Sequence, residues 1–172
     1  MEHSIRPTSP LLLALSDIKI AHSVFAMPFA LLAAFLSSPD LQGSTMTSAR
    51  PRFYVQLLLI ALCMVLARTW AMLINRLADS RFDHDNPRTA RRVFASGRLT
   101  LRQGWAIALV CATAFVAACG AFVLFNNSWP LILSLPVLAW IALYSYTKRF
   151  TLLCHLFLGG ALAASPIAAA IA

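Results

Sequence analysis

Charged residues are scarce in this chain of 172 residues: they make up 12% of it, and only six are acidic. Soluble domains carry roughly 25% charged residues, about twice as many. Hydrophobic residues make up 60% of the chain, which excludes a disordered protein and argues against a lone soluble domain. The composition therefore indicates an integral membrane protein.

The basic excess is fourteen Lys and Arg against six Asp and Glu. Membrane proteins collect such residues in cytoplasmic loops, so this excess gives no reason to expect a nucleic-acid partner. The four cysteines show no Cys-x-x-Cys spacing, and we interpret them as packing residues. A cleaved signal peptide is not expected either, because the first apolar run, Leu11 to Leu15, is short and is followed by Asp17 and Lys19.

The prediction of membrane-spanning helices rests on long tracts without charged residues. A membrane-spanning helix needs about 20 predominantly apolar residues. The longest uncharged tract, residues 103–147, therefore holds two spans, separated by the turn signal at residues 126–130. We predict one all-α, polytopic transmembrane helical bundle with five spans: 18–37, 53–74, 104–125, 130–147 and 151–172.

Loop charge predicts the orientation. Half of the basic residues, seven of the fourteen, lie between residues 75 and 102. The positive-inside rule places this loop and the N-terminus in the cytoplasm. The chain stops at Ala172 inside an apolar stretch, so we expect a fragment or a truncated reading frame.

Three of the six acidic residues cluster after the second predicted span, as Asp79, Asp83 and Asp85. Asn75, Asp79 and Asp83 are four residues apart, so they share one helix face, whereas Asp85 lies about 120° from Asp79. A helix over residues 53–83 is about 46 Å long and outreaches the roughly 30 Å hydrocarbon core. Oxygen ligands of this kind suit Mg²⁺ bridging to a diphosphate. The alternative is a solvated helix end with local Asp–Arg pairs.

The stretch Asn75 to Asp83 resembles the N-x-x-x-D-x-x-x-D motif of the UbiA superfamily of intramembrane prenyltransferases. Residues 86–90, NPRTA, and the following Gly97 resemble the extension found in its quinone-pathway members. Residues 144–149, YSYTKR, resemble their Y-x-x-x-K element. Residues 19–30 are similar to the first helix of the branch that prenylates 4-hydroxybenzoate or serves menaquinone synthesis.

The resemblance implies a nine-helix all-α bundle in a bacterial inner membrane, with an active site open to lipid. This chain ends before the second aspartate-rich motif that the family carries. The implied reaction is Mg²⁺-dependent transfer from a polyprenyl diphosphate to a small aromatic acceptor, 4-hydroxybenzoate-like or naphthoate-like. Mg²⁺ supplies a Lewis acid for the departing diphosphate, and Asn75, Asp79 and Asp83 are the implied catalytic and metal-binding residues.

The resemblance also implies substrate contacts. Lys148 and Tyr144 would contact the diphosphate, with Arg149 as a further candidate, although a basic anchor beside an interfacial aromatic is equally typical of membrane proteins. Arg68 would hold an aromatic carboxylate or a phosphate, or else a partner within its own helix. His22 would contact the acceptor or serve as a hydrogen-bonded packing residue.

A second function stays open at this point. The missing second motif is also compatible with a catalytically inactive bundle that binds membrane lipid or a partner subunit.

Overall fold

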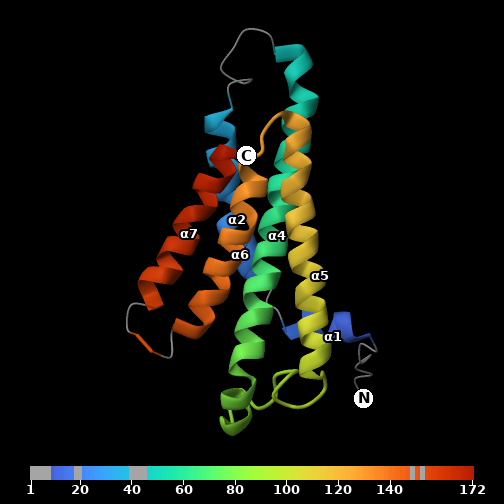
Figure 1. Cartoon of the computed structure of the whole chain (residues 1–172), viewed down its shortest axis with the longest axis vertical. Helices are drawn as coiled ribbons and strands as arrows, with labels where there is room; N and C mark the ends of the chain where they lie inside the picture. Colours follow the sequence, from blue (N-terminus) through green and yellow to red (C-terminus); the bar gives the residue numbers. More distant parts are fainter. Residues whose placement is uncertain (1–8, 18–20, 39–45, 148–149, 152–153) are drawn as a thin grey trace.

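The computed structural model describes residues 9–17, 21–38, 46–147, 150–151 and 154–172. Over these residues the chain is a bundle of helices (Figure 1), which confirms the all-α prediction. The elements are α1 (Pro10–Asp17), α2 (Ala21–Ser37), α4 (Met46–Asp85), α5 (Leu101–Gly120), the 3₁₀ helix η1 (Ala121–Phe125), α6 (Trp129–Thr147) and α7 (Cys154–Ile171).

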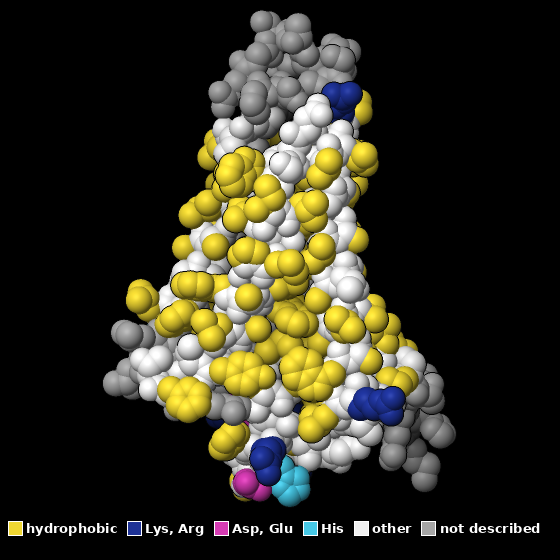
Figure 2. Space-filling view, in the orientation of Figure 1, with side chains coloured by type: hydrophobic (Ala, Val, Ile, Leu, Met, Phe, Trp, Pro, Cys, Tyr) yellow, Lys and Arg dark blue, Asp and Glu magenta, His cyan; other side chains and the backbone are white. Residues whose placement is uncertain are grey.

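The surface of the bundle is apolar. Leu58, Val110 and Leu135 are 70%, 67% and 66% exposed, and hydrophobic side chains cover most of the face seen in Figure 2. Water does not tolerate so large an apolar surface, whereas lipid does. Three described helical stretches are long and apolar enough to cross a membrane, and two shorter helices are also apolar: Pro51–Asp85, Leu101–Phe125 and Trp129–Thr147, then Met27–Ser37 and His155–Ile171. The chain is thus a multi-pass membrane protein, and the number of five spans stays a prediction.

Local sequence explains where the helices begin and end. Asn86-Pro87 follows directly after α4, because proline disfavours helical backbone in the residue before it. Thr100 and Gln103 form a reciprocal capping box at the start of α5. Asn126 ends η1 in the left-handed region at φ 61°, and the Asn127 side chain accepts the Trp129 amide at the start of α6.

Helix α4 packs against α2, α5 and α6, while α7 packs against α2 and α6. Midway along the bundle, the Trp70 indole donates to the carbonyl of Leu138 on α6 at 3.1 Å. On the α5 side, the sulfur atoms of Cys63 and Cys119 lie 3.8 Å apart. These contacts fix α4 between its two neighbours and therefore fix the direction of its polar end.

The predicted loop 75–102 contains more structure than its charge suggests. Residues 75–85 continue α4, so only residues 86–100 are non-helical. Val93, Phe94 and Leu99 of this segment, called the basic segment below, are buried in a cluster with residues of the three neighbouring helices: Leu73, Ile74 and Leu77 of α4, Ala108 of α5 and Ala14 of α1. Burial of apolar side chains thus holds a strongly basic segment against the bundle. Helix α1, which the sequence did not predict, crosses this end of the molecule (Figure 1).

Gly104 on α5 makes the packing of the basic segment possible. A Cβ atom at this position would lie 2.7 Å from Leu77 Cδ2 and 2.8 Å from Phe94 Cζ, well inside van der Waals contact. By contrast, a Cβ at Gly120 of the same helix would meet only Leu131 Cδ1, at 3.7 Å.

We therefore expect Gly104→Ala to destabilise the protein and Gly120→Ala to leave it unchanged or slightly more stable. Overpacking costs about 1–3 kcal/mol, while alanine favours a helix over glycine by about 1 kcal/mol. Thermal unfolding of the purified protein in detergent tests this difference. Equal midpoints for the two variants would contradict the close packing of Phe94 and Leu77 on Gly104.

Candidate functional site at the polar end of the bundle

Polar chemistry gathers where α4 leaves the apolar part of the bundle. At 1.5 Å per residue its 40 residues extend about 60 Å, twice the roughly 30 Å hydrocarbon core. The last turns of α4 and the basic segment lie together at the lower end of Figure 1, and charged side chains are visible there in Figure 2. This end of α4 therefore extends beyond the apolar part of the bundle.

The face predicted to hold a metal lies on this continuous helix. Asn75 and Asp79 are half-buried, whereas Asp83 is only 7% exposed. Asp85 is exposed and lies beside His84, with 3.2 Å between Nδ1 and Oδ1. The amide and carboxylate oxygens of the first three residues are the donors that hard cations prefer. Within the described ranges, no three His, Cys, Asp or Glu side chains gather as a complete metal site.

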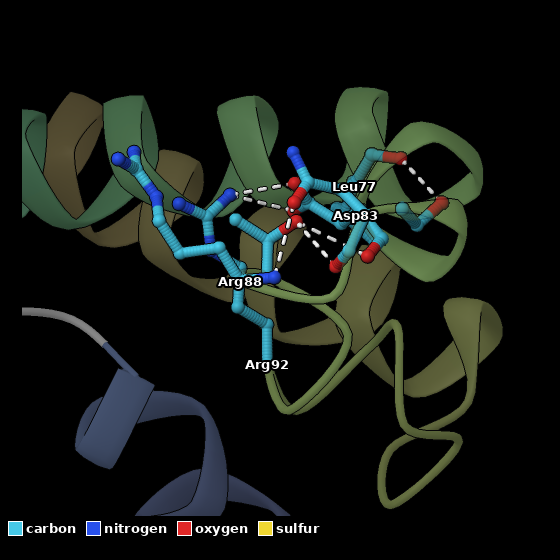
Figure 3. Close-up of polar contacts among 7 residues, drawn as sticks. Leu77, Asp83, Arg88 and Arg92 are labelled. Atoms are coloured by element: carbon cyan, nitrogen blue, oxygen red, sulfur yellow. Dashed lines mark hydrogen bonds and ion pairs between the residues drawn. The ribbon is translucent and has the colours of Figure 1, made fainter.

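The carboxylate of Asp83 already has a cationic partner. Nη1 of Arg92 donates to both Oδ1 and Oδ2 at 2.7 Å (Figure 3). The two side chains are 28% and 10% exposed for Arg92 and Asp83, so the pair is largely removed from water. The local Asp–Arg pair that the sequence left as an alternative therefore exists at Asp83. Removing one partner of such a pair costs on the order of 3 kcal/mol.

Hydrogen bonds fasten the basic segment to the end of α4. The Thr89 hydroxyl donates to the Asp83 carbonyl at 3.1 Å, which satisfies one of the carbonyls that a helix leaves without a partner in its last turn. The Asn86 side chain accepts the Arg88 amide at 3.0 Å, a local turn that asparagine favours. Farther along, Arg98 donates to the Arg91 carbonyl at 2.9 Å. Gly97, which directly precedes Arg98, adopts the left-handed backbone conformation that glycine favours, with φ 71°.

The predicted substrate contacts occupy different positions in the bundle. Arg68 is half-buried on α4, and its Nε atom is buried with no hydrogen-bond partner among the described residues. Tyr144 is half-buried near the end of α6. Lys148 and Arg149 lie outside the described residues. His22 belongs to α2, but its side chain also lies outside the described part.

From the sequence, neither Arg92 nor Thr89 was assigned a contact with Asp83. Their roles depend on the path of the basic segment, which places Arg92 against a carboxylate nine residues earlier in the chain. A usable signal was present, because Val93, Phe94 and Leu99 are apolar residues inside an otherwise basic stretch. Such residues indicate docking onto a bundle more than exposure to water.

The chain is similar in sequence to known enzymes. A 4-hydroxybenzoate octaprenyltransferase of Azotobacter vinelandii is 37% identical over 97 residues, which are 56% of this chain and 32% of that protein. The enzyme of the same name from Hydrogenovibrio crunogenus is 38% identical over 108 residues, 62% of this chain and 36% of that protein. The chain thus spans about a third of the length of these relatives.

One solved structure is similar to this chain in both fold and sequence. The apo structure of a UbiA homolog from Aeropyrum pernix K1 superposes with a TM-score of 0.72 at 32% identity, covering 88% of this chain and 50% of that one. The profile of the UbiA prenyltransferase family matches residues 20–172. With the aspartate face at the polar end of a membrane bundle, this match shows that the chain belongs to the UbiA prenyltransferase family.

Proposed function

We propose that the protein transfers a polyprenyl group from an allylic polyprenyl diphosphate to a small aromatic acceptor, 4-hydroxybenzoate or a close analogue. The observation that carries this proposal is the oxygen-donor face of α4 at the polar end of a lipid-facing bundle. Relatives named as 4-hydroxybenzoate octaprenyltransferases support the choice of acceptor. The naphthoate acceptor of menaquinone synthesis gains no support from these relatives.

The donor set fits Mg²⁺, because Asn75, Asp79 and Asp83 offer only oxygen atoms. When bound, the ion would neutralise charge that grows on the departing diphosphate. The three residues occupy successive turns of one unbroken helix, so the backbone holds their relative positions. To bind the ion, the Asp83 carboxylate must exchange its ion pair with Arg92 for a contact with the metal.

The proposed diphosphate contacts lie at the end of helix α6, which neighbours α4, and in the residues that follow it. The Trp70 bond to Leu138 places α6 beside α4, and Tyr144 lies near the end of that helix. Lys148 and Arg149 follow within one turn in sequence, and we propose that they bind the diphosphate with Tyr144. Basic side chains aimed at these oxygens stabilise the developing negative charge.

Arg68 is the proposed partner of the acceptor. A cation within an apolar span is costly and indicates a functional contact, and its buried Nε has no partner among the described residues. A carboxylate on the aromatic ring would satisfy this charge and orient the ring. We propose His22 of α2 as a further contact to the acceptor.

The positive-inside rule supports an orientation with the N-terminus and the 75–102 region in the cytoplasm. The bacterial relatives support a location in a bacterial inner membrane. Soluble substrates would then approach the site from the cytoplasm, and the polyprenyl chain would approach from the lipid.

Replacing Asp79 by Asn should lower prenyl transfer at least about a hundredfold, because a charged ligand that stabilises the leaving group is lost. Transfer is measured in membranes from cells that express the protein, with Mg²⁺, polyprenyl diphosphate and 4-hydroxybenzoate. Asp85→Asn is the matched control, since Asp85 is exposed and lies off the face, and it should retain turnover. Undiminished turnover in Asp79→Asn would contradict the site, and no turnover in the unmodified protein would favour a non-catalytic bundle.

Replacing Arg68 by Gln should lower kcat/KM for 4-hydroxybenzoate about 10–100-fold, because hydrogen bonds to charged groups contribute about 1.5–3 kcal/mol. The methyl ester of the acceptor carries no charge at that position and serves as the control substrate. The unmodified protein should prefer the acid over the ester, and Arg68→Gln should remove that preference. A preference that survives the substitution would show that Arg68 does not bind the carboxylate.

A further inference from the structure

The Asp83–Arg92 pair lies within the proposed metal face, and this position calls for an explanation. Asp83 is the third residue of that face, yet its two carboxylate oxygens both accept Arg92 Nη1 at 2.7 Å. One cationic group thus occupies the carboxylate that the proposed function assigns to another cation.

The position of Asp83 near the carbonyl end of α4 explains why its carboxylate needs a cation beside it, whether or not a metal ion is bound. Asp79, Asp83 and Asp85 all fall in the last two turns of α4. The carbonyl end of a helix carries a partial negative charge, so carboxylates there are unfavourable unless a cation is near. Asp83 is the most buried of the three, and a buried carboxylate without a partner is costly. Arg92 supplies that partner from outside the helix.

The same contact holds the basic segment closed. Arg92 directly precedes Val93 and Phe94, which are buried against α4 and α5. Three residues earlier, Thr89 donates to the backbone of Asp83. Figure 3 shows Arg92 reaching back to Asp83 from this segment. The partner of the Asp83 carboxylate and the position of the segment are therefore coupled through one ion pair.

We propose that Arg92 competes with a divalent cation for the Asp83 carboxylate, so that binding of the cation releases the Arg92 guanidinium. Arg92 is then a positioning residue that holds Asp83 and the basic segment together in the unliganded protein. This inference rests on the proposed function, since it uses the same face of α4. It adds a residue that neither the motif nor the comparisons assign.

Competition has two measurable consequences, because coupling between two bound groups is reciprocal. A protein without the Arg92 guanidinium binds the cation more tightly. A protein with bound cation holds the basic segment more weakly. A purely structural Arg92 predicts the opposite of the first consequence, since a disordered site loses cation affinity.

The first experiment measures Mn²⁺ binding to the full chain in detergent by electron paramagnetic resonance, without diphosphate. Arg92→Gln should tighten Mn²⁺ binding at least about tenfold, whereas Arg92→Lys, which keeps a cation, should stay near the unmodified protein. Arg91→Gln is the matched control, because it removes one positive charge from the adjacent, exposed residue. If Arg92→Gln binds Mn²⁺ no more tightly than Arg91→Gln, or not at all, the inference is wrong.

The second experiment follows the basic segment by trypsin cleavage after Arg88 and Arg98, both exposed, with fragments identified by mass spectrometry. Mn²⁺ should accelerate these cuts several-fold in the unmodified protein, and Asp83→Asn should be cut faster without metal. A cooperative thermal unfolding transition identifies variants that still fold, even where the midpoint is lowered. Cleavage that ignores both Mn²⁺ and Asp83→Asn would overturn the coupling.

The two proposals fail in different ways. Tighter Mn²⁺ binding in Arg92→Gln, combined with no prenyl transfer by any form of the protein, would leave the competition intact and overturn only the proposed function. Prenyl transfer that depends on Asp79, combined with unchanged Mn²⁺ affinity in Arg92→Gln, would overturn only the competition.

Discussion

The hydrocarbon core of the membrane is the constraint on which the rest of the structure depends. It tolerates neither unpaired backbone groups nor isolated charge, so apolar helices fill it and the acidic residues are left to the ends. Helix α4 has 40 residues and extends well beyond this core. Its surplus length carries Asn75, Asp79 and Asp83 to the polar end of the bundle, where we propose that a polyprenyl diphosphate is held.

A second requirement follows from placing carboxylates at the carbonyl end of a helix. Negative side chains and the helix dipole repel each other there, so the end of α4 needs cations to be stable. The basic segment meets this need through Arg92, and its buried Phe94 and Val93 fix the segment in place. The same electrostatic demand favours a divalent ion at this face, as we propose. Structural stability and the proposed chemistry therefore draw on one interaction.

Much of this architecture could be predicted from the sequence because membrane helices are specified locally. The long uncharged tracts predicted the all-α bundle, and the four-residue spacing placed Asn75 and Asp79 on one face of a helix that the structure shows to be continuous. The contacts of the basic segment could not be predicted, because Arg92 reaches Asp83 only through a folded path that ends in buried Phe94. Helix α1 was missed since its eight residues are too few to give a strong periodic signal. The roles of Asn75, Asp79, Asp83, Tyr144 and Arg68 in catalysis stay predictions.

Prenyl transfer itself is the central claim, and its most direct test is product analysis. Membranes that contain the protein are given polyprenyl diphosphate and 4-hydroxybenzoate, and lipid extracts are examined by mass spectrometry with Mg²⁺ and after chelation. The expected result is prenylated 4-hydroxybenzoate that forms with Mg²⁺ and disappears when the metal is removed. Absence of this product with Mg²⁺, or equal amounts with and without metal, would contradict metal-assisted prenyl transfer at the polar end of α4.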